Sequence, residues 1–224
     1  MALAGLASGP FLHTLAVQAG ADLPLRPFAL SCPRCPNTKW TVRCSCGRGR
    51  LREVGTGAVA AIGAGVVTGA IGWVPTLAAH LLLVAVTTIL IVTDLDHMRI
   101  PNRILYPGGF ACLALLGLGA FADGRLGDLV RGLAAGALYW CVFLVVWLSA
   151  RGQGFGFGDV RLSALLGLFL GFHSWQLLAW GLLATALLGG IPAIVLLALG
   201  KGRKTLLPYG PPLILGTWLA IAIM

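Results

Sequence analysis

Long apolar segments separated by short polar connections run through the whole chain. These segments predict helices at residues 2–20, 55–73, 76–93, 104–121, 129–149, 160–173, 175–199 and 207–223. A helix needs about 20 apolar residues to cross the hydrocarbon core of a bilayer. The pattern therefore predicts an all-α, polytopic membrane protein with about eight transmembrane helices. No Lys or Arg precedes the first apolar segment, so we interpret it as a retained helix and not as a cleavable signal peptide.

The composition agrees with a membrane protein. Hydrophobic residues make up 58% of the chain and charged residues only 10%, whereas charged residues make up about 25% of an ordinary soluble domain. The 16 Lys and Arg residues exceed the 7 Asp and Glu residues, and the net charge is +9. A basic balance of this kind is found in nucleic-acid-binding proteins and also in membrane proteins with basic cytoplasmic loops. The distribution of the charges distinguishes the two.

The basic residues gather in connections that fall on one side of the membrane if eight helices alternate in direction. Only Arg125 and Arg131 fall on the opposite side. The basic residues on the shared side are Arg26, Arg34, Lys39, Arg43, Arg48, Arg50, Arg52, Arg99, Arg103, Arg151, Arg161, Lys201, Arg203 and Lys204. Cytoplasmic loops of membrane proteins carry such an excess. We therefore predict an outside N-terminus, membrane lipid and no nucleic acid as partner, and cytoplasmic turns at residues 94–103 and 151–161.

The first of these turns carries two acidic residues at the end of an apolar helix. Asp94 directly follows the apolar run, Asp96 lies two residues later, and Pro101 prevents simple continuation of the helix. Residues two apart point in different directions from a helix, so only one of the two acids faces the interior of the bundle easily. Asp94 is the deeper of the two. Taken alone, both acids also fit a solvated position at the membrane interface.

The second cytoplasmic turn is rich in glycine and ends in an acid. Residues 154–159 read Gly-Phe-Gly-Phe-Gly-Asp, and an apolar helix pattern follows. Taken alone, Asp159 fits an ordinary helix N-cap, preceded by glycines of an ordinary turn. Gly156 and Gly158 would also let the backbone approach a substrate closely, because no side chain stands in the way.

Asp94 and Asp159 are predicted at the same membrane face, and the pair indicates a chemistry that neither residue indicates alone. Two carboxylates that share a site do not both ionise readily, so one of them keeps its proton. The ionised carboxylate can activate a water as general base. The protonated one can polarise a carbonyl and later protonate the leaving amine. This division of roles is that of an aspartyl protease.

A proline-rich stretch opens the last predicted helix, again on the cytoplasmic side. It contains Pro208, Tyr209, Gly210 and Pro211. Prolines hold the backbone open, and an extended edge can pair with an extended substrate. The same residues equally fit a stiff helix start with proline in its first turn.

These three motifs resemble, in order, those of the type 4 prepilin leader peptidases, within the wider group of Gly-x-Gly-Asp intramembrane aspartyl proteases. Asp94, followed seven residues later by Pro101, resembles the first aspartate motif. Residues 156–162 resemble the second, in which a basic residue commonly follows the Asp by two positions. Residues 208–211 resemble the Pro-Phe-Gly-Pro segment of the family, with Tyr209 in place of Phe.

The resemblance implies a catalytic dyad of Asp94 and Asp159, with Asp96 tuning the dyad or binding the substrate. Gly156, Gly158 and residues 208–211 would contact the substrate. That substrate would be a prepilin or pseudopilin, in which a short basic leader and a glycine precede an apolar helix. Cleavage would follow the glycine, at the cytoplasmic face of the bacterial inner membrane, in a pilus, type II secretion or DNA-uptake system.

Many members of the family also N-methylate the new amino terminus with S-adenosylmethionine. The resemblance ties that activity to the large cytoplasmic loop, which here spans only about residues 21–54. The loop contains no glycine-rich nucleotide-binding turn. The sequence therefore leaves N-methylation open.

The same loop, between a first helix at 1–20 and a protease domain at 55–224, carries four of the 6 cysteines. Disulfides do not persist in a reducing cytoplasm, whereas four thiolates can hold a structural Zn²⁺ tetrahedrally. The predicted ligands are Cys32, Cys35, Cys44 and Cys46. Only one residue separates the second pair, where two are expected of a zinc ribbon, so free thiols are the alternative. Cys112 and Cys141 lie in apolar segments and are predicted to be small core residues.

Other functions fit some of these features. Another Gly-x-Gly-Asp protease, such as an archaeal preflagellin peptidase or a presenilin-like enzyme, would use the same two acids, although the four-cysteine loop argues against it. A proton-coupled transporter could relay protons through Asp94 and Asp159. It would predict inverted repeats, which the sequence does not show. A scaffold subunit with an inactive site would not need both acids.

The zinc prediction is tested by metal analysis of the purified protein. We expect about one zinc ion per chain, held by the four thiolates, and its loss in the double variant Cys32→Ser, Cys35→Ser. A wild-type protein without zinc would show that the thiols are free.

Overall fold

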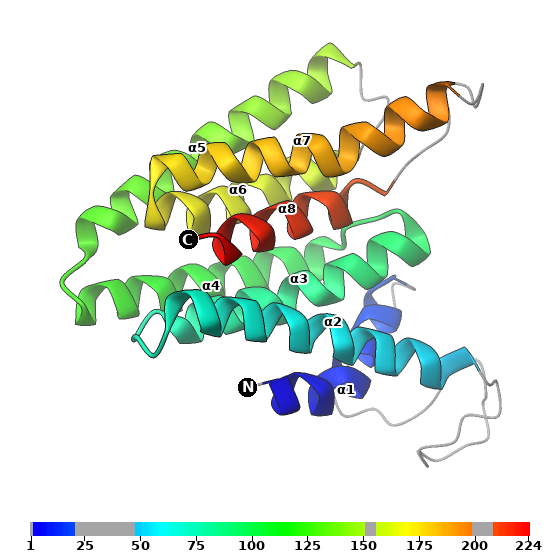
Figure 1. Ribbon diagram of the computed structural model, residues 1–224, viewed down its shortest axis with the longest axis horizontal. Coiled ribbons are helices and arrows are strands. Elements are labelled where there is room, and N and C mark those ends of the chain that lie inside the picture. The colour runs from blue at the N-terminus through cyan, green and yellow to red at the C-terminus, as the bar shows by residue number, and fades with distance from the viewer. Residues whose placement is uncertain (1, 21–47, 151–155, 199–207) are drawn as a thin grey trace.

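The computed structural model describes residues 2–20, 48–150, 156–198 and 208–224, and this part of the chain contains helices and no strand (Figure 1). The all-α prediction is therefore confirmed for the described residues. The helices are α1 (Ala2–Gly20), α2 (Arg48–Ile71), α3 (Leu77–His97), α4 (Asn102–Ala122), α5 (Leu126–Ser149), α6 (Phe157–His173), α7 (Trp175–Ala198) and α8 (Gly210–Ala222). Each of them falls on one of the predicted apolar segments.

Five helices among the described residues are long and apolar enough to cross a membrane, which indicates a polytopic membrane protein. They cover Arg52–Ile71, Leu77–His97, Asn102–Ala122, Leu126–Ser149 and Trp175–Pro192. Helix α8 is apolar but has only 13 residues, and α6 has 17. The count of eight membrane spans therefore stays a prediction.

Helix α8 occupies the middle of the bundle (Figure 1). It packs against α2 and α3 on one side and against α6 and α7 on the other. Its central position matters because α3 carries Asp94 and α6 carries Asp159. The two acid-bearing helices therefore share α8 as a common neighbour.

Small residues bring α5 and α6 into the closest packing of the bundle. A Cβ atom at Gly132 would lie 2.7 Å from the carbonyl oxygen of Leu168, and one at Gly136 would lie 2.8 Å from that of Ala164. On the facing helix, a Cβ atom at Gly167 would lie 2.6 Å from the Cβ of Tyr139. Such close approach is the usual reason for small residues between membrane helices. These three glycines therefore have a packing role.

Both helices that carry an acid extend further than the apolar pattern predicted. Helix α3 continues past residue 93 to His97, because the N–H of Met98 still donates to the carbonyl oxygen of Asp94 at 2.8 Å. It ends where Met98 takes a left-handed conformation with φ of 50°. Helix α6 begins at Phe157 and not after Asp159. Both acids therefore lie inside the terminal turns of helices.

Helix α2 likewise begins at Arg48, well before the predicted start at residue 55. Its first turns are polar, and they extend the helix beyond the part that is apolar enough to span a membrane, which starts at Arg52. The predicted boundary between the loop and the protease domain at residues 54 and 55 therefore falls within a continuous helix.

The packing of α5 on α6 makes a stability prediction. The variant Gly136→Leu should destabilise the protein by about 1–3 kcal/mol, the usual cost of overpacking, because a side chain there meets the backbone of α6. Gly127→Leu is the matched control, since Gly127 lies on the same helix and no atom lies within 4 Å of the place that a Cβ would take there. Melting temperatures in detergent compare the two, and an equal effect of both would contradict the packing.

Candidate active site

The carboxylate of Asp94 is held by the first residue of α8. Asp94 lies in the last turn of α3 with only 4% of its surface exposed. Its Oδ2 accepts a hydrogen bond from the backbone N–H of Gly210 at 2.9 Å. A Cβ atom at Gly210 would lie 2.8 Å from that oxygen, so the close approach requires glycine. The unpaired N–H groups at a helix start suit a carboxylate.

Asp159 is the third residue of α6 and bonds back to the residue before the helix. Its Oδ2 accepts a hydrogen bond from the N–H of Gly156 at 3.0 Å, and its own N–H donates to the carbonyl oxygen of Gly156 at 3.0 Å. Gly156, and not Asp159, is therefore the N-cap. Among the described residues, Asp159 Oδ1 has no hydrogen-bond partner although it is buried. Leaving such an atom unpaired is costly, and functional sites are one place where this occurs.

The two acids lie in the same region of the structure. Asp94 and Asp159 lie close enough for their charges to interact, and the Tyr209 side chain lies within electrostatic reach of Asp159. The three residues come from α3, α6 and the segment that leads into α8. Since each acid has only 4% of its surface exposed, their interaction is screened far less than it would be in water.

The two aspartate motifs are joined by a contact that the sequence did not reveal. Arg161 donates from Nη1 to Asn102 Oδ1 at 2.7 Å, and its guanidinium lies 4.6 Å from the centre of the Phe157 ring. A Cβ atom at Gly158 would lie 2.8 Å from the Cβ of Ile100. The start of α6 therefore packs on the turn between α3 and α4. The only signal for this contact was that Asn102 and Arg161 each sit a few residues from an acid.

Asp96 points to a different neighbour from Asp94. Its Oδ1 forms an ion pair with Arg52 of α2 at 2.7 Å. This agrees with the expectation that two acids two residues apart face different directions. The role of Asp96 in tuning the dyad or binding the substrate stays a prediction.

The predicted substrate-binding glycines differ in what surrounds them. At Gly158 the position of a side chain is taken by Ile100, so this glycine has a packing role. At Gly156 the nearest atom to an added Cβ would be Asp159 Oδ2, at an ordinary contact distance of 3.7 Å. Contact of either glycine with a substrate stays a prediction.

The proline-rich segment forms a helix start. Helix α8 begins at Gly210, Pro211 lies in its first turn, and Tyr209 has helical dihedral angles. Of the two alternatives for this segment, the stiff helix start is observed and an extended edge at Tyr209 is not. Pro208 precedes the helix and is partly buried.

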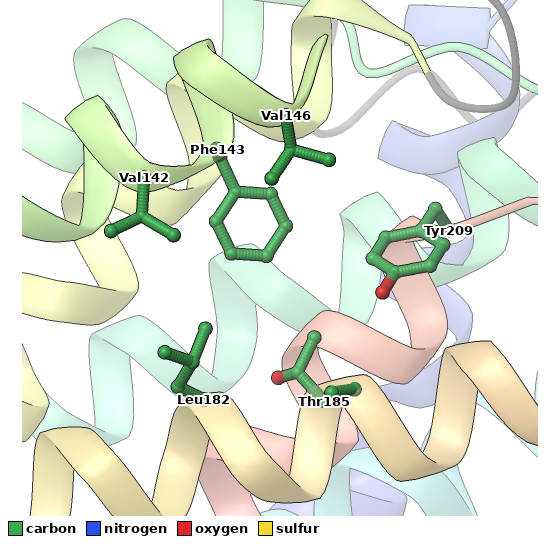
Figure 2. Close-up of a pocket in the computed structure, with 7 residues that line it drawn as sticks. Val142, Phe143, Val146, Leu182, Thr185 and Tyr209 are labelled. Carbon is green, nitrogen blue, oxygen red and sulfur yellow. The ribbon is translucent and has the colours of Figure 1, made fainter. Parts of the chain in front are cut away.

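Tyr209 closes one side of a small apolar pocket. A side chain at Gly189 of α7 would overlap the Tyr209 ring, and the ring centre lies 6.3 Å from that of Phe143 on α5. Figure 2 shows these side chains around the opening. The pocket has a volume of about 150 Å³ and is lined by Val142, Phe143, Val146, Leu182, Thr185, Ala186 and Tyr209.

The comparison with known protein families decides the assignment. Residues 81–194, about half of the chain, match the type IV leader peptidase family. The chain belongs to this family. The matched region includes Asp94 and Asp159 and ends before Pro208. No solved structure matches the chain.

Curated relatives of the family share about a third of their aligned residues with this chain. The prepilin leader peptidase/N-methyltransferase of Aeromonas hydrophila is 38% identical over 155 residues, which are 67% of this chain and 50% of the relative. That of Pseudomonas aeruginosa is 33% identical over 130 residues, covering 57% and 43%. That of Escherichia coli K12 is 34% identical over 140 residues, covering 59% and 57%. The chain thus spans about half the length of the curated relatives it matches.

Several residues for which the sequence predicts a functional role in this leader peptidase family member lie outside the described part of the chain. They are Gly154 of the glycine-rich turn and the predicted zinc ligands Cys32, Cys35, Cys44 and Cys46. Within the described residues, no group of three or more His, Cys, Asp or Glu side chains could hold a metal ion. Cys112 is buried, as predicted for a core residue, but Cys141 is exposed because it faces out from α5, so that prediction was wrong.

The contact between Gly210 and Asp94 makes a prediction about activity. Gly210→Ala should push the Asp94 carboxylate out of place, and a misplacement of about 1 Å can cost a rate factor of about 100. Gly190→Ala is the control, because no atom lies within 4 Å of a Cβ added there. Cleavage of a prepilin by membranes that contain equal amounts of each variant compares them. Full activity of Gly210→Ala would show that Asp94 does not depend on this contact.

Proposed function

We propose that this protein is a membrane-embedded aspartyl endopeptidase that removes the leader peptide of prepilins or pseudopilins. The observation that carries the proposal is the pair of buried, interacting carboxyl groups of Asp94 and Asp159, which come from two helices of a chain in the type IV leader peptidase family. The names of the relatives support the same reaction and substrate class.

In the proposed mechanism the two carboxyl groups share one proton and act as a unit. The ionised carboxylate takes a proton from a water molecule, and the oxygen of that water attacks the carbonyl carbon of the scissile peptide bond. The protonated carboxyl group donates its hydrogen to the carbonyl oxygen. The leaving amine then takes the proton that the first carboxyl group removed from the water, a hydroxyl of the tetrahedral intermediate returns its proton to the second carboxyl group, and the C–N bond breaks. Asp159 Oδ1 is buried and has no hydrogen-bond partner among the described residues, so it would accept a hydrogen bond from water or substrate that enters the site.

The N-termini of two helices would stabilise the negative charge that develops in this reaction. Asp159 lies in the first turn of α6, and Gly210 is the first residue of α8. Each helix start carries a partial positive charge of about half an elementary charge. A site that excludes water lets such fixed dipoles stabilise an oxyanion strongly.

The proposed substrate has a short basic leader, a glycine and an apolar helix, and is cut after the glycine. The excess of Lys and Arg in the connections next to Asp94 and Asp159 supports a cytoplasmic position for the site. The apolar helix of the substrate would lie in the inner membrane. Its junction with the leader would then reach the level at which α3 ends and α6 begins.

N-methylation of the new amino terminus is the second activity in the names of the relatives. The donor would be S-adenosylmethionine. Residues 21–47 of the loop to which the family resemblance ties this activity lie outside the described part of the chain. Mass spectrometry of the mature pilin would show the added methyl group directly.

The dyad is tested by replacing each acid. We expect Asp94→Asn and Asp159→Asn each to reduce leader cleavage by at least about 100-fold, the usual contribution of a general acid or base, while the protein still inserts in the membrane. Co-expression with a prepilin and the size shift of the product measure this. Asp123→Asn is the control, since Asp123 is exposed where α4 ends. Full processing by either dyad variant would refute the proposed function.

A further inference from the structure

The pocket beside Tyr209 opens between two helices of the bundle. Its inner wall is formed by the buried side chains of Phe143 on α5 and Thr185 on α7, while Val146 and Ala186 at its rim are exposed. Figure 2 shows α5 supplying one wall, α7 the opposite wall and Tyr209 the third side. The pocket is thus accessible from the outer surface of the bundle, where apolar segments of other chains or lipids lie.

The size and lining of the pocket define the ligand that it fits. An apolar cavity of about 150 Å³ in a soluble protein holds a benzene molecule, and this pocket has a volume of about 150 Å³. None of the seven lining residues is charged. The hydroxyl of Thr185 lies 3.4 Å from that of Tyr139, so one of the few polar groups here has a protein partner. The pocket therefore suits one aromatic or large aliphatic group.

The pocket and the candidate dyad are connected through Tyr209 and Gly210. Tyr209 lines the pocket, and the next residue, Gly210, donates its N–H to Asp94. Tyr209 also lies within electrostatic reach of Asp159. Tyr209 therefore borders both the pocket and the region of the two carboxyl groups, where a substrate would bind.

The depth of the pocket indicates which part of a substrate would reach it. The Trp147 ring packs on that of Phe157, the first residue of α6, with 5.2 Å between the ring centres. Phe143 lies one turn further along α5 towards the membrane interior, about 6 Å away at 1.5 Å per residue. An extended chain advances about 3.3 Å per residue. A substrate that ran in extended form from the start of α6 towards the interior of the bundle would therefore reach the level of the pocket within about two residues.

We infer that this pocket is a specificity subsite for one large apolar side chain of the substrate, the first or second residue after the scissile bond. This inference rests on the proposed function. The residues before the bond are a glycine and a basic leader in the proposed substrate, and neither suits an uncharged, ring-sized pocket. The residues after the bond begin an apolar helix. Thr185, Leu182 and Ala186 of α7 and Val142 of α5 would set the size of the side chain that fits.

The experiment changes the pocket and the substrate together. Ala186→Leu fills the pocket, and Leu182→Ala enlarges it. Leu187→Phe is the control, because Leu187 is 50% exposed on the same helix and does not line the pocket. The substrates are one prepilin with Ala, Leu, Phe or Trp placed in turn at each of the first two positions after the cleavage site. The readout is kcat/KM for leader removal in detergent micelles.

We expect wild type to prefer Leu and Phe over Ala at one of the two positions. A single methylene in a hydrophobic pocket changes kcat/KM by about 10- to 200-fold. Ala186→Leu should shift the preference at that position by at least about 10-fold towards Ala, and Leu182→Ala should shift it towards Trp. The control should keep the wild-type order. Partial unfolding cannot explain substrate preferences that shift in opposite directions in two variants of the same α7 wall.

Two results would overturn the inference. If wild type cleaves all substrates equally at both positions, no subsite of this kind exists. If Ala186→Leu and Leu182→Ala slow all substrates by one factor, the pocket has a structural or lipid-binding role. In both cases leader removal by wild type would leave the proposed function intact. Failure of wild type to cleave any prepilin would refute the proposed function, and the subsite with it.

Discussion

The hydrogen bond from the Gly210 N–H to the Asp94 carboxylate is the contact on which the rest of the site depends. A buried carboxylate without a donor would cost several kcal/mol, and a side chain at Gly210 would occupy the space of that carboxylate. The acid and the glycine therefore require each other. Because α8 also packs on α6 and α7, this bond links the end of α3 to the helix on which α6 and α7 pack. It also places Tyr209 at the wall of the pocket.

A second set of contacts secures the other acid. Arg161 binds Asn102, and Gly158 packs on Ile100, so the start of α6 rests on the turn that follows α3. Glycines along α5 and α6 hold the rest of α6 by backbone contact. Contacts therefore hold both the start of α6 and the rest of the helix. They offset the cost of burying Asp159 Oδ1, which has no partner among the described residues. Native proteins leave such atoms mainly where a ligand, water or reaction uses them.

The helices could be predicted from the sequence because a bilayer demands long apolar segments. The ends of α3 and α6 could not, because hydropathy stops at an acid whereas the backbone bond from Met98 to Asp94 continues the helix. The predicted alternation of the helices was the only sequence signal that placed Asp94 and Asp159 at the same membrane face. The contacts of Arg161 with Asn102 and of Asp96 with Arg52 join residues 59 and 44 positions apart, and a single sequence does not show which faces of distant helices meet. The pocket was missed for the same reason, since α5, α7 and Tyr209 each contribute only part of its wall.

The family match ends at residue 194, but the candidate site includes residues beyond that position. Tyr209 and Gly210 lie beyond that limit, and they supply the donor to Asp94 and the shared wall between the carboxyl groups and the pocket. Without α8, the two acid-bearing helices would lose the neighbour on which both pack. A chain that kept only the matched region would retain both acids and the contact of Arg161 with Asn102, but not the donor to Asp94 or the helix on which both acid-bearing helices pack. Since catalysis depends on holding reacting groups within a fraction of an ångström, the last helix belongs to the candidate active site as much as the two helices that carry the acids.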